Sequence, residues 1–533
     1  MSTNFLRDKN GKPRLLLGLQ AHNSSTGTHM IEKAIHAVKL YGGNVIEVPI
    51  YWNIIEPEEG KFDTRSVKDL ILQVRNASLK LIILWFGTSK NGHPNYAPDY
   101  VKLDPEKYRL ALRPDGAPVP SMSPHCRANI EVDKRAFVEV MRCIREVDEE
   151  FGTVAAIQIE NEIGLANTDR CYSLAAQKDY ALPVPEELKD ISLEDMGEKD
   201  HTHTWRGKFG RHAHEAFTAW YFARFVDEIA AAGKAIYNIP MTVNIMLGEN
   251  GVEEAGFSYN SGAAVGRVID IWKKGAPHID ILCPDIYLSS RDSYTRVCNR
   301  YSRQDNPLFI AETFTSGEHM ALNAMRAIAD YGAVGICGFG AESTLDNNGN
   351  LLKAAETFAI TMRAIAALEP LIVRYHGTGK IHALLQEEFS GEQYVKLENY
   401  HVQAKFFSAE GSRPFWLGSS INVRNPENAH ILKERGRALL VQTGEYEFYM
   451  AGAGVQVDFI RRPHPSDIHP YVHLTSRQSG QLNFLSVEEG HFDGENWVCD
   501  YIRNGDEANG GLYVHPGQVV RIRLNPNIGM DIE

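Results

Sequence analysis

Long apolar runs are missing from this sequence. No stretch is long enough to span a bilayer, and the first residues, MSTNFLRDKNGKPR, contain no apolar core of signal-peptide length. Positive charge is also in short supply: 55 Lys and Arg stand against 68 Asp and Glu, a net charge of −13. Such a charge argues against nucleic acid or an anionic membrane as a partner. We therefore expect a cytoplasmic protein, and neutral, polar ligands remain open.

Cysteine is scarce and scattered. The seven cysteines are odd in number and never spaced CxxC, so we expect free thiols in a reducing compartment rather than a zinc site. None of the 20 histidines lies in an HExxH motif, and no Asp/His cluster follows a predicted strand. We therefore expect neither a metal nor a cofactor, and a metal-dependent hydrolase is disfavoured.

The first two thirds of the chain alternate between short aliphatic runs and amphipathic, helix-like segments. Its 533 residues are too many for one ordinary core. Eight runs predict strands: residues 14–20, 44–52, 79–87, 153–160, 240–246, 278–287, 307–312 and 333–339. Near-continuous apolar runs are typical of parallel strands that are covered on both faces, so we predict an α/β fold, a (β/α)8 TIM barrel. A doubly wound open sheet is the alternative, but no glycine-rich phosphate loop follows the first strand.

A different pattern follows the helical stretch LLKAAETFAITMRAIAALEP. Segments such as YEFYMAGAGVQVDFI alternate polar and apolar residues between Gly, Asn and Pro turns, which is typical of antiparallel sheets. We predict two domains, a catalytic barrel over residues 1–375 and a smaller all-β, sandwich-like domain over residues 376–533. The second domain contains no motif that indicates a function.

Polar side chains gather where the predicted strands end. The carboxyl ends of barrel strands meet at one rim, and active sites of this fold lie there. The polar or aromatic residues at these positions are His22, Asn23, Ser24, Ser25, Trp52, Asn53, Glu56, Lys90, Asn91, Glu160, Asn161, Glu162, Asn244, Asp285, Tyr287 and Glu312. So many polar groups at one rim indicate a pocket that hydrogen-bonds a hydroxyl-rich ligand.

Two acids, Glu162 after the fourth strand and Glu312 at the end of the seventh, are predicted to face each other across the barrel mouth. Cleaving an acetal needs an acid that protonates the leaving oxygen and a carboxylate that meets the oxocarbenium-like carbon. With the two roughly 5–5.5 Å apart, the carboxylate attacks directly and the configuration is retained. Repulsion and partial burial raise the pKa of one of them, which keeps it protonated near neutral pH.

Three other rim side chains have two interpretations each. Glu160 is a competing acid, but we favour a strand-end carboxylate that pairs with a nearby Arg or Lys. Trp52 and Trp85 are candidate platforms for a sugar ring, although barrel cores use such residues as well.

Several stretches, in order, resemble a known family. AIQIENEIG and NPLFIAE resemble the retaining barrel glycosidases. LLLGLQAHNSS, WNIIEPEEGKFD, LIILWFGTSKNGHPNYAPDYVK and APHIDILCPDIY resemble glycoside hydrolase family 35, the β-galactosidases, in the bacterial subgroup whose C-terminal β-domain has no assigned role. The resemblance spans most of the barrel, residues 14–345.

The resemblance implies roles for single residues. Glu162 would be the general acid/base and Glu312 the nucleophile. Asn161 would hydrogen-bond the 2-hydroxyl of the sugar, and Tyr287 would hold the carboxylate of the nucleophile. The predicted rim adds further candidate substrate contacts: Trp52, Trp85, Asn23, Asn91 and Asn244.

The sequence departs from the family at one place. Family members carry an Asn-Ala-Glu-like element after the third strand that grips galactose, whereas this chain has Trp85–Phe86–Gly87 followed by Lys90 and Asn91. Preference for galactose is therefore less firmly implied than hydrolysis.

The sequence thus predicts a retaining, exo-acting glycoside hydrolase that removes terminal β-galactosyl residues by double displacement. The same mechanism on another β-linked sugar (a β-glucosidase, β-xylosidase or transglycosylase) is one alternative. A non-catalytic sugar-binding barrel is another, although a binder has no need of two opposed acids. The expected partner is a β-galactoside oligosaccharide, with no nucleic acid and no membrane, and a homo-oligomer remains open.

Overall fold

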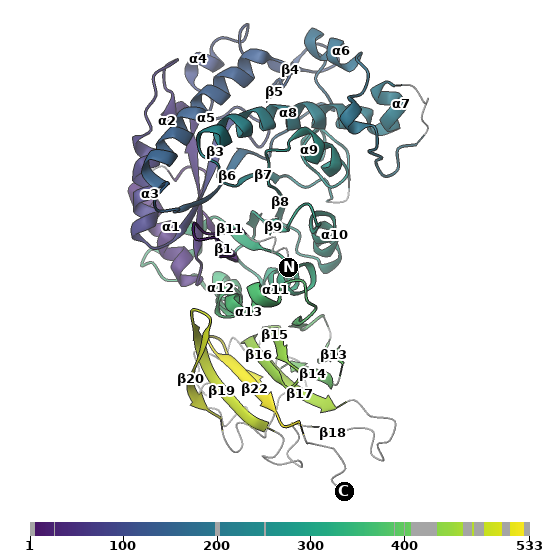
Figure 1. The fold of residues 1–533 in the computed structure, drawn as a ribbon. Helices are drawn as coiled ribbons and strands as arrows, with labels where there is room; N and C mark the ends of the chain where they lie inside the picture. The colour runs from purple at the N-terminus through teal and green to yellow at the C-terminus, as the bar shows by residue number, and fades with distance from the viewer. Residues whose placement is uncertain are drawn as a thin grey trace.

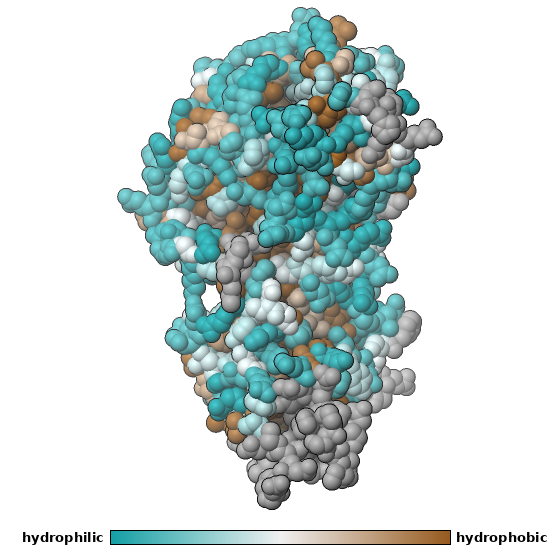
Figure 2. Space-filling view, turned by 45° about the vertical axis from the view of Figure 1, so that its right-hand side comes forward, coloured by the Kyte–Doolittle hydropathy of each residue, from teal (hydrophilic) through white to brown (hydrophobic). Residues whose placement is uncertain are grey.

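The computed structural model describes residues 6–25, 27–197, 203–249, 252–388, 390–398, 400–406, 434–461, 472–473, 484–503 and 512–526. Within these residues, no helix combines the length and the apolar character needed to cross a membrane. Figure 1 shows a large α/β unit above a smaller β unit. On the face shown in Figure 2, hydrophilic residues dominate and hydrophobic residues occur in small, scattered groups.

The main sheet closes into a barrel. Its order is β10-β8-β7-β6-β3-β2-β1-β11-β9, and every paired neighbour is parallel. The strands are β1 (Leu16–Gln20), β2 (Val45–Tyr51), β3 (Lys80–Lys90), β6 (Val154–Asn161), β7 (Met241–Ile245), β8 (Ile281–Ile286), β9 (Phe309–Ile310), β10 (Glu312–Thr313) and β11 (Gly335–Phe339). Only Ala311 separates β9 from β10, so the two ends of the sheet are halves of one strand. The predicted eight-stranded barrel is confirmed, and the open sheet is wrong.

Amphipathic helices cover the outside of the barrel (Figure 1). In α3 (Arg65–Asn76) the buried residues Val67, Leu70, Ile71 and Val74 follow the three-and-four spacing of one helical face. The other long helices are α1 (Thr28–Leu40), α5 (Arg127–Asp148), α8 (Ala213–Ile236), α10 (Arg291–Tyr301), α11 (Glu318–Tyr331) and α12 (Lys353–Ala367). Because helices lie outside and side chains fill the inside, strands such as β2 are buried along their whole length.

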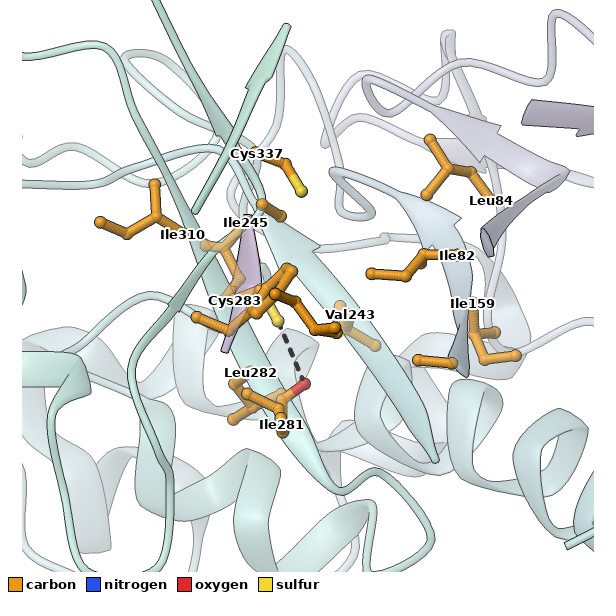
Figure 3. Packing of buried hydrophobic residues seen from close by; sticks show 14 of the residues in the cluster. Ile82, Leu84, Ile159, Val243, Ile245, Ile281, Leu282, Cys283, Ile310 and Cys337 are labelled. Atoms are coloured by element: carbon orange, nitrogen blue, oxygen red, sulfur yellow. Dashed lines mark hydrogen bonds between the residues drawn. The ribbon is translucent and has the colours of Figure 1, made fainter. Parts of the chain in front are cut away.

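Aliphatic side chains and two thiols fill the middle of the barrel (Figure 3). Ile82 of β3, Ile281 and Cys283 of β8, and Cys337 of β11 are buried there. All seven cysteines are free thiols, as expected.

The C-terminal part is all-β, as predicted. An antiparallel six-stranded sheet contains β12 (Ile381–Leu385), β15 (Arg437–Gly444), β16 (Glu447–Ala453), β22 (Val519–Leu524), β19 (Phe484–Asp493) and β20 (Asn496–Ile502). A second sheet contains β13 (Glu392–Lys396), β14 (Tyr400–Phe406), β17 (Val455–Arg461), β18 (Val472–His473) and β21 (Leu512–Val514). The predicted boundary at residue 375 falls where α13 (Glu369–Tyr375) ends.

The six-stranded sheet has two apolar faces. Leu440 and Met450 belong to the core that it shares with the second sheet, whereas Leu439 and Ala451 belong to the core of the barrel. Alternate residues of a strand point to opposite faces, so one sheet packs on its partner sheet and on the barrel helices at once. The β-domain is therefore fixed to the barrel by a continuous apolar contact.

Candidate active site

One amide links the two predicted catalytic acids. Glu162 directly follows β6 and Glu312 begins β10, and their exposed fractions are 8% and 4%. The backbone N–H of Glu162 donates to Oδ1 of Asn244 at 2.9 Å, and Nδ2 of Asn244 donates to Oε1 of Glu312 at 3.3 Å. The structure therefore brings the two acids together on either side of β7.

Glu312 is held by three donors. Gln20 Nε2 donates to its Oε1 at 3.0 Å, alongside Asn244, and the hydroxyl of Tyr287 donates to its Oε2 at 2.7 Å. The contact from Tyr287 is the one that the family resemblance implies. Donors from β1, β7 and the end of β8 fix the direction of both oxygens, which suits a carboxylate that must attack one carbon.

The pKa of Glu162 is shifted in the direction that a general acid needs. Burial, and then the nearby Glu312 carboxylate, raise the pKa of Glu162 to about 7, while the Lys90 ammonium and a hydrogen bond with Asp285 act in the opposite direction. A carboxyl group with such a pKa is protonated in a large fraction of molecules at neutral pH, as general acid catalysis requires.

The backbone around Glu162 is strained. Glu160 and Glu162 have φ angles of 60° and 45°, in the left-handed region that non-glycine residues avoid. Asn244 holds the N–H of Glu162, and Asn260 Nδ2 donates to its carbonyl oxygen at 2.8 Å. Side chains from later parts of the chain therefore keep the acid in an unfavourable conformation.

Glu160 is turned away from the second acid. Its Oε1 accepts from the N–H and the hydroxyl of Thr88 at 3.1 and 2.9 Å, and its Oε2 accepts from the N–H of Ser89 at 2.6 Å. Within the described residues no Arg or Lys pairs with Glu160, so the ion pair that we favoured is wrong. Burial, and then Asp133, raise its pKa well above the usual value, so Glu160 is a buried structural acid.

A bulge in β3 explains why the Glu160 side chain is turned away from the second acid. Trp85 pairs with Ile159 and Lys90 pairs with Asn161, so residues 86–89 of β3 lie opposite a single residue of β6. Glu160 binds the backbone of this bulge. At Gly87 an added Cβ would lie 2.5 Å from the indole nitrogen of Trp85, so only glycine fits there.

The bulge delivers Lys90 and Asn91 to the site. Asn161 Nδ2 donates to Oδ1 of Asn91 at 3.0 Å, and Oδ1 of Asn161 accepts from Asn244 at 3.2 Å. Lys90 is buried, with its Nζ 5.2 Å from the centre of the Phe86 ring. Asn91, Asn161, Asn244 and Tyr287 thus form one network around the two acids.

The two tryptophans do not reach the pocket. Trp52 and Trp85 have no exposed area, and their indole N–H groups donate to Glu56 at 3.1 Å and Asp133 at 2.8 Å. Their prediction as substrate contacts is wrong because both rings pack into the core. The exposed ring beside the pair is Phe314, which is 49% exposed and meets the Tyr287 ring edge-on at 4.9 Å. Its place two residues after Glu312 was the available signal.

Asn23 lies on the loop after β1. Its backbone oxygen accepts from the hydroxyl of Tyr96 at 3.0 Å, and its own Oδ1 is buried with no partner in the described part of the chain. The same loop is tied to Glu342, after β11, which accepts from the N–H of His22 at 3.1 Å. Asn23 therefore offers, near the rim, an acceptor that has no partner among the described residues.

Two further acids lie in the site: Asp285, which was named only as a polar residue of the predicted rim, and Glu47, which was not predicted there. Both are almost fully buried, and burial raises the pKa of each well above its usual value, reinforced by Glu312. Both carboxyl groups therefore hold their protons more tightly than a solvated carboxyl group does. Asp285 Oδ2 accepts from Asn244 at 2.7 Å, whereas Asp285 Oδ1, Glu47 Oε2 and Gln20 Oε1 are buried without a hydrogen-bond partner in the described ranges. Such polar atoms suit a ligand rich in hydroxyl groups. Among the described residues, no group of three His, Cys, Asp or Glu is arranged to hold a metal ion.

Comparison with known proteins adds a family to this geometry. Residues 24–238, which include Asn161 and Glu162, match the model of glycoside hydrolase family 42, described as "Beta-galactosidase". Residues 361–515 match a domain of unknown function, DUF5597. The match over residues 24–238 is thus to family 42 rather than to family 35, which the motifs suggested. The motifs that suggested family 35 lie at strand ends, where any retaining barrel hydrolase needs carboxylates and amides, so they do not separate the two families.

Individual relatives are distant. Beta-galactosidase 14 of Arabidopsis thaliana is 36% identical over 62 residues, which are 12% of this chain and 7% of that protein. The β-galactosidase of Bacillus circulans sp. alkalophilus has a TM-score of 0.49 at 15% identity, over 68% of this chain and 57% of that one. The β-galactosidase of Halorubrum lacusprofundi has a TM-score of 0.46 at 17% identity, over 66% and 58%. The chain thus spans under two thirds of each of these proteins.

The raised pKa of Asp285 can be tested by measuring Tm as a function of pH. Because its pKa is raised, the folded chain binds its proton more tightly than the unfolded chain does. Its effect on stability is therefore lost as the pH rises from the unfolded pKa toward the folded one, by about 1.4 kcal/mol per pH unit. Asp285→Asn, a permanently neutral near-isostere, should raise Tm at pH 8 relative to the unsubstituted chain, and the gain should vanish toward pH 4.

Asp115→Asn is the control for this measurement. Backbone hydrogen bonding from Ala117 and pairing with Arg113 lower the pKa of this exposed acid, so its substitution should not raise Tm at pH 8. If Asp285→Asn lowers Tm equally at pH 4 and at pH 8, relative to the unsubstituted chain, the result would contradict the raised pKa.

Proposed function

We propose that this chain is a retaining, exo-acting glycoside hydrolase, a β-galactosidase, that acts on a β-galactoside oligosaccharide. One observation carries the proposal: Asn244 bridges two acids at the ends of β6 and β10, one with a raised pKa and one held by three donors. The match of residues 24–238 to a family described as β-galactosidases supports the same activity.

The proposed mechanism has two steps. In the first, Glu312 attacks the anomeric carbon while Glu162 gives its proton to the glycosidic oxygen, so the aglycone leaves and a covalent glycosyl–enzyme forms. In the second, Glu162, now a carboxylate, takes a proton from water, which displaces Glu312 and restores both acids. Asn161 is the proposed donor to the 2-hydroxyl of the sugar, with its orientation fixed by Asn91 and Asn244.

Lys90 and Phe314 have proposed roles beside the pair. Lys90 is the buried cation that counters the effects of burial and of Glu312 on the pKa of Glu162. Without it, Glu162 would give up its proton less readily. The half-exposed ring of Phe314 offers an apolar face to the aglycone at the mouth of the pocket.

The Lys90–Asn91 pair bears on which sugar is preferred. The Lys90–Asn91 pair stands where a galactose-gripping element was expected from the resemblance, which keeps glucosidase, xylosidase and transglycosylase activity as the second candidate. Initial rates on 4-nitrophenyl β-galactoside, β-glucoside and β-xyloside separate these sugars. The galactose proposal fails if another glycoside is hydrolysed fastest. The proton NMR spectrum of the first product gives its anomeric configuration and so tests retention.

Glu312→Gln should abolish turnover, with a fall in kcat of about 10⁴-fold or more, because an amide cannot form the covalent intermediate. Galactoside binding, measured by calorimetry, should remain, since the amide keeps the shape of the side chain. Glu32→Gln, an exposed acid on α1, is the control and should be unchanged. Near-normal rates in Glu312→Gln would end the assignment.

Glu162→Ala should impair natural galactosides far more than 2,4-dinitrophenyl β-galactoside, because a good leaving group needs no protonation. Sodium azide should restore its turnover and give β-galactosyl azide, since the anion fits the space that the acid leaves. An equal loss on both substrates, with no azide product, would argue against the acid role.

The pH profile should follow the Glu162 proton. Activity needs the protonated form, so kcat/KM should fall as the pH rises through about 7. Lys90→Met removes the cation that lowers this pKa, so the falling limb should move to higher pH. Lys80→Met, at the other end of β3, should leave the limb in place. A limb that stays fixed in Lys90→Met, or that moves in Lys80→Met, would contradict this assignment.

A further inference from the structure

A hydrogen-bonded relay connects the β-domain to the candidate active site. Arg326 of α11 donates through Nη2 to Oε1 of Glu387, just after β12, at 2.5 Å, and through Nη1 to Oδ1 of Asn323 at 2.6 Å. Asn323 Nδ2 donates to the backbone oxygen of Ser289 at 3.1 Å. Arg326 and Asn323 are only 4% and 2% exposed, whereas the Glu387 side chain at the start of the relay is 38% exposed.

The relay ends in the loop that follows Tyr287. Ser289 is two residues after Tyr287, whose hydroxyl donates to Glu312. Ser290 caps α10, and Arg291 in its first turn also lies 3.5 Å from Oε1 of Glu387. One carboxylate of the β-domain thus contacts this loop through Asn323 and through Arg291.

A second contact holds the loop after Glu312. The backbone N–H of Arg435, just before β15, donates to Oε1 of Glu318 at 3.4 Å, and its Nε lies 3.7 Å from Oε2. Glu318 is the first residue of α11 and follows Gly317, whose φ angle is 91°. The β-domain therefore contacts the start of α11 as well as the loop before α10.

Another ion-pair contact with the barrel lies away from these loops. Glu495, in the turn between β19 and β20, pairs with Arg374 at 3.0 Å and with Lys12 at 3.5 Å. Lys12 precedes β1 and Arg374 is in the last turn of α13, so this contact is at the closed, N-terminal end of the barrel. Substitution of Glu495 can therefore serve as a control for substitution of Glu387.

We infer that the C-terminal β-domain is a positioning element for the nucleophile side of the active site. Through Glu387 and Arg435 it fixes the loops that set Tyr287 against Glu312, and it leaves the Glu162 side to the barrel itself. The inference rests on the proposed function, and it assigns a role to the region that matches a domain of unknown function.

Small displacements at this loop matter. The carboxylate of Glu312 must meet one carbon in line, and a misplacement of about 1 Å can cost up to ~100-fold in rate. If Glu387 is removed, Arg326 is left as a buried cation without this partner, and it is expected to rearrange and release Asn323. The loop then loses the donor to Ser289.

The test compares Glu387→Ala with Glu495→Ala in the full chain. Glu387→Ala should lower kcat about tenfold with little change in KM, because positioning rather than binding is lost. Covalent trapping by 2,4-dinitrophenyl 2-deoxy-2-fluoro-β-galactoside should slow in parallel. Glu495→Ala should leave both rates unchanged. Equal loss in the two variants, or no loss in either, would overturn the inference.

Asn323→Ala provides a second test that keeps the ion pair with the β-domain. It should reproduce the loss of kcat, and the double variant with Glu387→Ala should be no slower than either single variant, because both break one relay. Fully additive losses would overturn the relay.

Hydrogen exchange separates this inference from the proposed function. Backbone amides of residues 287–291 should exchange faster in Glu387→Ala and in Asn323→Ala, and at an unchanged rate in Glu495→Ala. This readout needs no turnover, so a chain without galactosidase activity would still report on the relay. Unchanged exchange in both relay variants would reject it.

Discussion

Around the two candidate acids, the buried carboxyl groups of Glu47, Glu162, Asp285 and Glu312 lie near the buried ammonium group of Lys90, and this excess of acids governs the site. Four ionised acids in so little water would repel one another strongly, so protons must remain on some of them. Burial raises the pKa of Glu47 and of Asp285 well above the usual value, Glu312 is surrounded by donors, and the pKa of Glu162, near Lys90, is raised to about 7. The two candidate catalytic acids therefore differ in how readily they hold a proton, and this difference follows from their surroundings.

Much of this arrangement could be read from the sequence, because it depends on local pattern. Apolar runs and helical periodicity gave the eight strands, and strand ends gave the two acids, Asn161, Asn244 and Tyr287. Features set by distant partners were missed. Trp85 is removed from the pocket by Asp133, 48 residues away, and Glu160 is turned aside by a bulge in another strand. Neither contact can be predicted from the residues that flank Trp85 or Glu160 in the sequence.

The β-domain illustrates the same limit at a larger scale. Its alternating strands predicted a sheet, and the sheet is present, but nothing in the alternation says which of its two faces meets the barrel. Leu439 and Leu440 are neighbours in sequence and belong to different cores. Its charged contacts, Glu387 with Arg326 and Arg435 with Glu318, are visible only once the two units are docked.

The contacts of Glu162 also fix when the site can form during synthesis. The side chains that hold its unfavourable backbone, Asn244 and Asn260, come 82 and 98 residues later. A chain emerging from the ribosome therefore carries its acid long before it can hold that acid in place. The loop beside the other acid waits for Glu387, later still. Assembly of the candidate active site is in this way deferred until the first strand of the β-domain, β12, has been made.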